Sequence, residues 1–232
     1  MILDNAIHAA LTGPHARFAE RHGNALRYQP AVSPFTALPD DPSETDWKDL
    51  AALTSTAVLT GPAVEPPEGW QVETRLPLLQ FADDGIAAAP DAEAVRLTAA
   101  DVPEMLALTE LTKPGPFLQR TIEMGAYLGV RQGGRLVAMA GERLRVPGWT
   151  EISAVCTHPD ARGQGLGTRL MLAVAHGIRE RGETPFLHVL ASNTGAIRLY
   201  EHMGFRLRLR SELVIAGSVS SCHRSPSSTP PT

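Results

Sequence analysis

The stretch that decides the fold covers residues 155–168 and reads Val155-Cys156-Thr157-His158-Pro159-Asp160-Ala161-Arg162-Gly163-Gln164-Gly165-Leu166-Gly167-Thr168. Its apolar start predicts a strand, its middle a glycine-rich turn, and its end the first turn of a helix. Free backbone N–H groups converge at a helix N-terminus, where the helix dipole is positive, so this order of elements predicts an anion site. Glycines let a ligand approach the backbone closely, and the Arg162 guanidinium is a good phosphate donor. The segment therefore predicts a phosphate-binding loop.

The glycine spacing argues against two common nucleotide-binding motifs. Gly163, Gly165 and Gly167 alternate with single residues, whereas dinucleotide folds use G-x-G-x-x-G and P-loops end in G-K-[ST]. A nicotinamide-dependent protein would also need an early βαβ unit, which the sequence lacks. For this segment alone, a plain helix-capping turn with incidental glycines stays open as the alternative.

A second informative segment follows a predicted strand at residues 186–190. It reads Asn193-Thr194-Gly195-Ala196-Ile197-Arg198-Leu199-Tyr200-Glu201-His202-Met203-Gly204-Phe205. Together the two segments resemble the GNAT superfamily of N-acetyltransferases, with its R-x-x-G-x-G acetyl-CoA loop and its N-x-x-A-x-x-L-Y-x-x-x-G-F strand and helix. The resemblance covers about residues 94–216.

The elements expected after residue 92 follow the order β-α-β-β-β-α-β-α-β. We expect strands at 95–97, 127–131, 136–145, 151–157, 186–190 and 205–215, a helix that begins after Thr98, and helices at 168–181 and 194–202. The resemblance implies an α/β (α+β) fold in which helices flank a mixed, mostly antiparallel twisted sheet. One departure is visible: after Phe205 the chain offers one strand where the fold usually has two joined by a loop.

Residues 1–90 are weakly patterned and interrupted by prolines. We expect a short helix at 46–53 capped by Asp46, strands at 57–60 and 71–74, and a linker at 82–91. The predicted division is an N-terminal appendage at 1–90, a catalytic domain at 91–217 and a disordered Ser/Pro-rich tail at 218–232. The appendage resembles the degenerate N-terminal half that some family members carry.

Composition limits the function classes. The chain has 232 residues and a formal net charge of −4, which argues against a protein that binds nucleic acid by neutralising phosphate. No apolar run approaches the roughly 18 residues that span a bilayer, and no secretory signal is recognisable, so we expect no membrane partner. Only two cysteines are present, so a disulfide or a thiolate metal site is not expected, and a reducing cytoplasm fits best. A monomer or a homodimer is expected.

The resemblance assigns roles to individual positions. The end of the strand before the loop would pair with the pantetheine arm of acetyl-CoA, and the backbone amide near Val155 would polarise the thioester carbonyl. The loop would hold the pyrophosphate, and Asn193 would hydrogen-bond the pantetheine or a water as well as cap its helix. The expected cofactor-binding residues are Val155, Cys156, Thr157, Arg162, Gly163, Gln164, Gly165, Leu166, Gly167, Thr168 and Asn193.

Three residues are candidates for acid–base chemistry. Tyr200 occupies the family position of the acid that protonates the departing thiolate, a task that suits a phenol with a pKa of about 10. A base must remove a proton from the acceptor amine, and Glu151 is the first choice because it lies on the strand before the loop and is expected to share a face with Val155. His188, on the following strand, is the second choice, and both also have ordinary structural readings. Cys156 is not expected to carry an acyl group, because the family transfers directly and a strand cysteine is usually a small hydrophobe.

The function expected is therefore an N-acetyltransferase that moves the acetyl group of acetyl-CoA directly to an amine acceptor in a ternary complex. The alternative is a catalytically silent CoA-binding or scaffold protein.

Overall fold

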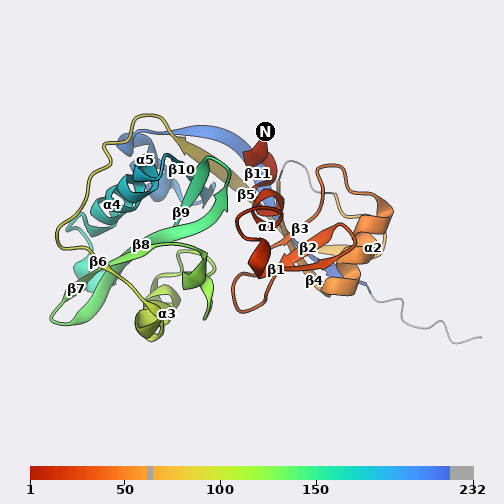
Figure 1. The fold of residues 1–232 in the computed structure, drawn as a ribbon, viewed down its shortest axis with the longest axis horizontal. Helices are drawn as coiled ribbons and strands as arrows, with labels where there is room; N and C mark the ends of the chain where they lie inside the picture. Colours follow the sequence, from red (N-terminus) through yellow and green to blue (C-terminus); the bar gives the residue numbers. More distant parts are fainter. Residues whose placement is uncertain (62–64, 220–232) are drawn as a thin grey trace, which may run out of the picture.

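The computed structural model describes residues 1–61 and 65–219, and its strands form two sheets (Figure 1). The strands are β1 Ala19–His22, β2 Ala25–Tyr28, β3 Thr36–Ala37, β4 Thr56–Gly61, β5 Trp70–Asp83, β6 Val95–Arg96, β7 Tyr127–Gln132, β8 Arg135–Val146, β9 Trp149–Thr157, β10 Thr184–Leu190 and β11 Phe205–Ser218. The helices are α1 Ala6–Leu11, α2 Glu44–Leu53, α3 Val102–Thr112, α4 Leu166–Glu180 and α5 Thr194–Met203, with short 3₁₀ turns between some of them.

The larger sheet has eight strands in the order β4-β11-β5-β10-β9-β8-β7-β6. Only β9 and β10 run parallel, and the other neighbours pair antiparallel. Helices α4 and α5 lie on one side of this sheet and α3 on the other (Figure 1). The predicted fold class, a mostly antiparallel sheet flanked by helices, is confirmed.

The elements after residue 92 follow the predicted order, and most boundaries agree within a few residues. Helix α4 begins at Leu166, two residues before the expected Thr168, because Gly165 adopts a left-handed conformation (φ 72°) and ends the loop there. Leu170, Met171 and Ile178 of this helix are fully buried against the sheet, as their helical spacing predicts.

The place between β10 and β11 is occupied by β5, which comes from the N-terminal part of the chain. Thus the sheet receives its additional strand from residues 70–83, while the chain after Phe205 supplies only β11. The expected strand at 71–74 is much too short: β5 pairs with β11 from Trp70 to Asp83 and with β10 from Leu78 to Ala82. The large sheet therefore contains strands from both sides of the boundary expected at residue 90, with β4 and β5 before it and β6–β11 after it.

The segment expected to be a linker is fixed to α4 at both ends. The Arg179 guanidinium binds the Asp83 carboxylate with contacts of 2.7 and 2.8 Å, and Arg169 binds Asp91 with contacts of 2.6 and 2.9 Å. Residues 82 and 83 belong to β5. Two arginine–carboxylate pairs thus hold residues 83–91 along the helix.

Residues 1–53 contain the second sheet, β1-β2-β3, and the two helices α1 and α2 that pack on it. Helix α2 begins at Glu44, and its N-cap is Ser43, not the predicted Asp46. The Ser43 hydroxyl accepts from the Asp46 amide, and the Asp46 carboxylate accepts from the Ser43 amide, so Asp46 completes a capping box as the third helical residue. This part packs on the large sheet through a core of apolar residues that includes Leu3, Tyr28 and Phe186. The predicted tail at 218–232 lies, apart from its first two residues, outside the described residues.

Candidate active site

Strands β9 and β10 separate at a defined point. Their parallel pairing joins Thr184 to Trp149 and Phe186 to Glu151, and it stops there. Residues 152–157 and 187–190 thus lie on two strands that are no longer hydrogen-bonded to one another. This divergence exposes backbone groups of both strands to any ligand that enters between them.

A bulge in β9 lies beside this opening. Ala154 has a positive φ of 53°. Between two successive pairs, Ser153 with Gly141 and Cys156 with Met139, β9 advances by three residues and β8 by two, so β9 contains one extra residue. As a result, Ile152 and Val155 both pack in the core beneath α4. The expectation that Glu151 and Val155 share a face is therefore wrong, because the bulge reverses the alternation between them.

The glycine loop forms an open cradle at the start of α4. Gly163 and Gly165 have φ values of 79° and 72°, and a Cβ atom at either would meet no other atom within 4 Å. Gly167 lies beside the opening, since a Cβ there would be 3.6 Å from Thr157 Oγ1 and 3.7 Å from Val155 Cγ1. The first N–H groups of α4 have no partner within the helix and point toward this loop. The cradle thus has the donors and the empty space that a phosphate group requires.

The other predicted loop residues divide into exposed and anchoring ones. Arg162 is exposed, whereas Leu166 is buried in the core. The Gln164 side chain accepts a hydrogen bond of 2.9 Å from Gln132 of β7. Thr168 is half-buried within α4. The anchoring residues fix the loop, and its exposed backbone remains open to a ligand.

Cys156 lies on the opposite face from Val155, in the core beneath α3. Only 7% of its surface is exposed, and burial raises the pKa of its thiol to about 11. A thiol that is buried and protonated at neutral pH is a poor nucleophile. Its packing matches the expectation that this cysteine is a small hydrophobe.

Helix α5 carries the two remaining residues of the second motif. Asn193 is its N-cap, and the side-chain oxygen accepts from the Ala196 amide at 3.1 Å. The half-buried ring of Tyr200 makes edge contacts with Phe81 and Phe205, at centroid distances of 6.4 and 6.2 Å. Within the described part of the chain, its hydroxyl takes part in no hydrogen bond. Burial raises the pKa of Tyr200, so this phenol stays protonated and able to donate at neutral pH.

The two candidate bases are in contact. The Glu151 carboxylate is 0% exposed and accepts from Arg143 at 2.7 and 2.8 Å and from His188 Nδ1 at 2.8 Å. Burial alone would raise the pKa of Glu151, but the Arg143 charge and the hydrogen bonds from Arg143 and His188 outweigh it and hold that pKa well below its usual range. His188 retains a small exposure, 10% of its side chain. Its other ring nitrogen, Nε2, lies 3.0 Å from Gln80 Nε2 on β5.

Gln80 and Arg143 were not identified from the sequence. They reach this cluster through strand register: Gln80 stands directly opposite His188 across β5 and β10. Neither residue belongs to a recognisable motif, so only the pairing of distant strands could have revealed them.

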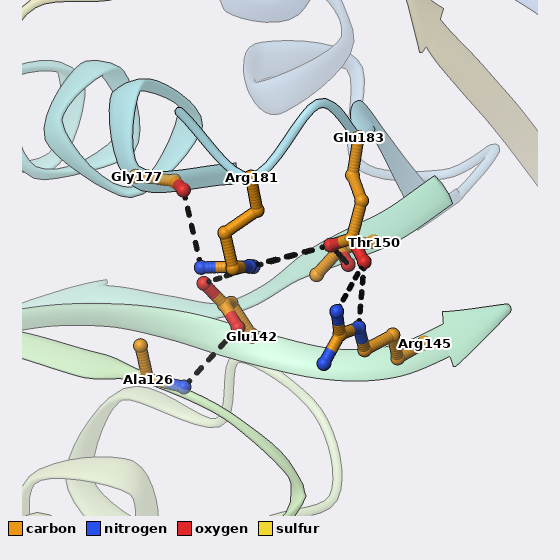
Figure 2. Close-up of polar contacts among 7 residues, drawn as sticks. All are labelled: Ala126, Glu142, Arg145, Thr150, Gly177, Arg181 and Glu183. Carbon is orange, nitrogen blue, oxygen red and sulfur yellow. Dashed lines mark hydrogen bonds and ion pairs between the residues drawn. The ribbon is translucent and has the colours of Figure 1, made fainter. Parts of the chain in front are cut away.

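A second charged cluster fixes the end at which β9 and β10 remain paired (Figure 2). The Glu183 carboxylate accepts from Arg145 Nε and from the Thr150 hydroxyl, both at 2.7 Å. Arg181, at the end of α4, donates to Glu142 at 2.9 Å and to the Gly177 carbonyl at 3.1 Å. These bonds attach the α4–β10 connection to β8 and β9, so the two strands can separate only toward the glycine loop.

Within residues 1–61 and 65–219, no group of three His, Cys, Asp or Glu side chains is placed to bind a metal ion. None of the helices in these ranges has the length and apolar character that a membrane crossing requires.

Comparison with known proteins places the chain in a family. The model of FR47-like proteins matches residues 127–214. A solved structure described as a GNAT-family acetyltransferase from Novosphingobium aromaticivorans is 40% identical, covers 95% of this chain and 100% of its own, and superposes with a TM-score of 0.87. A GCN5-related N-acetyltransferase from Kribbella flavida, 20% identical, covers 93% of this chain and 95% of its own with a TM-score of 0.62, and shows the shared fold alone. Mycothiol acetyltransferase from Thermomonospora curvata is 38% identical over 82 residues, which are 35% of this chain and 27% of that relative. This chain belongs to the GNAT family of acetyltransferases.

Proposed function

We propose that this protein transfers the acetyl group of acetyl-CoA directly to an amine, of a small molecule or of a peptide, in a ternary complex. The observation that carries the proposal is the opening between β9 and β10, which lies next to the glycine cradle at the start of α4. One edge of β9 is free over residues 152–157, and an extended ligand can pair with it as a neighbouring strand would. We also expect the protein to act in the cytoplasm, as a monomer or a homodimer.

The described residues fit acetyl-CoA. The pyrophosphate would occupy the cradle over Gly163 and Gly165, where Cβ atoms are absent and the backbone N–H groups of α4 are free. The pantetheine arm would follow the free edge of β9, with the Val155 amide near the thioester carbonyl. Asn193, whose side-chain nitrogen has no partner among the described residues, would hydrogen-bond the arm while its oxygen caps α5. Acetyl-CoA supplies the activated acetyl group and the thiol that leaves.

Tyr200 would act as the acid. In the reaction the amine nitrogen bonds to the acetyl carbon, the carbon–sulfur bond breaks, and the sulfur takes a proton. The Tyr200 ring and Val155 pack against the same core, and the hydroxyl, which has no partner among the described residues, is free to donate to a bound ligand. Burial raises the pKa of Tyr200, which keeps the proton available at neutral pH.

His188 is the better candidate for the base. An amine acceptor has a pKa of about 10 and must lose a proton to react. Glu151 is fully buried, and both of its oxygens are bound to Arg143, so a substrate cannot reach it without disrupting that ion pair. His188 is partly exposed and donates its Nδ1 proton to Glu151, which leaves Nε2 as the nitrogen that can accept. In this arrangement Glu151 orients His188.

Two measurements test the proposal. Thermal melting with acetyl-CoA, CoA and NAD should show stabilisation by both CoA species and none by NAD, because a ligand at one hundred times its Kd adds about 2.7 kcal/mol. Thiol release from acetyl-CoA should then depend on an amine from a panel of small-molecule and peptide amines. No stabilisation by either CoA species would refute the cofactor assignment. Stabilisation without amine-dependent thiol release would identify a catalytically silent CoA-binding protein.

A further inference from the structure

A continuous chain of hydrogen bonds crosses the large sheet on the face that the N-terminal segment covers. Each member lies on the strand next to that of the member before it, from β8 through β9, β10 and β5 to β11. Its members are, in order, Arg143, Glu151, His188, Gln80 and Arg208, and Arg208 also pairs with Asp4. An arginine ends the chain on β8 and another on β11. An arginine side chain can only donate hydrogen bonds, so the group next to each arginine must accept. The donors and acceptors of the residues between them are constrained from both ends.

Sheet register brings these residues together. Gln80 stands opposite His188 in the antiparallel pairing of β5 and β10. On the other side, β11 pairs Leu207 with Phe81 and Leu209 with Gln80, so Arg208 is the extra residue of a bulge. A bulge redirects the side chain of its extra residue, and here the Arg208 guanidinium contacts the Gln80 amide.

The orientation of the Gln80 amide is determined by two partners other than His188. Its oxygen accepts from Arg208 Nη1 at 2.5 Å, and its nitrogen donates to the Leu3 carbonyl at 2.9 Å. A rotated amide would place N–H groups against the guanidinium and oxygen against the carbonyl. Gln80 is 1% exposed, so water cannot compensate for such mismatches. The amide therefore presents only an N–H group to His188.

His188 must match this donor. Because Gln80 Nε2 is a donor, His188 Nε2 has to be an acceptor and carries no proton. The ring proton then resides on Nδ1 and is donated to Glu151 Oε1 at 2.8 Å. Protonation of Nε2 would set two donors against one another in a nearly closed environment.

We propose that Gln80 and Arg208 are positioning residues that hold His188 neutral, with its proton on Nδ1 and its lone pair on Nε2. The state of His188 follows from the contacts alone. Its catalytic consequence rests on the proposed function: Nε2 carries no proton, so it can receive one from an acceptor amine that displaces the Gln80 N–H from its lone pair. Arg208 acts through Gln80, because together with the Leu3 carbonyl it keeps the amide from turning over.

The nitrogen signals of His188 report this state directly. In the full chain labelled with ¹⁵N-histidine, the signal pair of His188 is assigned by its absence from a His188→Gln spectrum. At pH 7 we expect one protonated nitrogen, Nδ1, and one unprotonated nitrogen, Nε2. A proton on Nε2, alone or together with one on Nδ1, would overturn the proposal.

Variants test each positioning residue. Gln80→Glu replaces the donor with an acceptor of the same shape, so His188 should become protonated on both nitrogens at pH 7. Arg208→Met removes one of the two partners that orient the amide and should move proton density to Nε2, whereas Arg208→Lys retains a donor for Gln80 and should keep the wild-type pattern. Unchanged His188 signals in both Gln80→Glu and Arg208→Met, with the fold confirmed by the remaining resonances, would overturn the proposal.

Kinetics separate this proposal from the proposed function. If His188 is the base, Gln80→Glu should lower kcat at pH 7 by about 10²- to 10⁴-fold, with little change in the KM for acetyl-CoA. If the His188 signals change as expected and kcat does not, the positioning by Gln80 is supported and His188 loses its place in the reaction.

Discussion

Arg143 and Glu151 form an ion pair in which each carboxylate oxygen accepts one guanidinium hydrogen bond, at 2.8 and 2.7 Å, in a setting where the carboxylate is 0% exposed. The Glu151 carboxylate cannot regain water if Arg143 is removed, and the Arg143 side chain, which is 11% exposed, regains little if Glu151 is removed. The pair therefore matters to the fold as well as to the candidate site.

Glu151→Ala should lower the free energy of unfolding by about 3 to 5 kcal/mol, since it leaves the Arg143 charge buried and His188 Nδ1 without an acceptor. The matched control is Glu123→Ala, which removes an exposed carboxylate from Arg120. That change should cost at most about 1 kcal/mol. Urea unfolding measures both values, and similar losses in the two variants would contradict the importance assigned to the buried pair.

The same pair makes stability depend on pH. The pKa of Glu151 is lower in the folded chain than in the unfolded chain, so its contribution is complete above the unfolded value, about 4.3, and is lost as the pH falls through the folded value. The wild type should therefore lose stability below about pH 5. Glu151→Gln should be much less stable than the wild type at pH 7. The difference in their free energies of unfolding should become smaller as the pH falls. Urea unfolding at several pH values measures this difference, and a difference that stays constant with pH would show that Glu151 is not held ionised.

Tyr200→Phe should reduce kcat by about 10²- to 10⁴-fold, because the acid is removed while the ring still packs against Phe81 and Phe205. The KM for acetyl-CoA should change little. Tyr127→Phe is the matched control, since its buried hydroxyl has no partner among the described residues. It should keep the wild-type kcat and gain stability. Thiol release measures both variants, and an unchanged kcat in Tyr200→Phe would remove the tyrosine from its proposed role.

The elements after residue 92 could be predicted because their signals are local: alternation in strands, helical spacing and glycine turns. The full length of the 14-residue strand β5 could not be predicted in this way. It contains Pro77, which has no backbone N–H and usually ends a strand, and its partners lie in β10 and β11, more than a hundred residues further along the chain. Long-range pairing stabilises this strand, and no local window of sequence contains that information.

The candidate site likewise contains residues that the sequence could predict and residues that it could not. The glycine loop, Asn193 and Tyr200 are encoded in contiguous motifs. The face of Glu151 was predicted wrongly because the bulge depends on a positive φ at Ala154, and alanine gives no signal for that conformation. Gln80, Arg143 and Arg208 meet His188 and Glu151 through the register of five strands, which only the folded sheet defines.

Gly165→Ala should weaken CoA binding more than its effect on stability explains. Gly165 and Gly133 both have left-handed φ values, 72° and 57°, and a Cβ at either meets nothing within 4 Å. Each substitution to alanine should therefore cost about 1 to 2 kcal/mol of folding free energy. Gly133 lies in the β7–β8 turn, so only the Gly165 variant adds a methyl group to the cradle. Calorimetric titration with CoA should show a loss of affinity for Gly165→Ala and none for Gly133→Ala; equal affinities would contradict the cradle as the phosphate site.

Cys156 should be inert although it lies on the strand that borders the opening. Burial raises the pKa of its thiol to about 11, so roughly one thiol in a thousand is ionised at pH 8. Iodoacetamide should therefore leave Cys156 unmodified in the folded protein and alkylate it in urea, as peptide mass analysis can follow separately from Cys222, which lies outside the described residues. Cys156→Ala should retain the wild-type kcat, because direct transfer needs no acyl-enzyme. Rapid alkylation of the folded protein, or loss of turnover in the alanine variant with its fold intact, would instead indicate that the acetyl group passes through this sulfur.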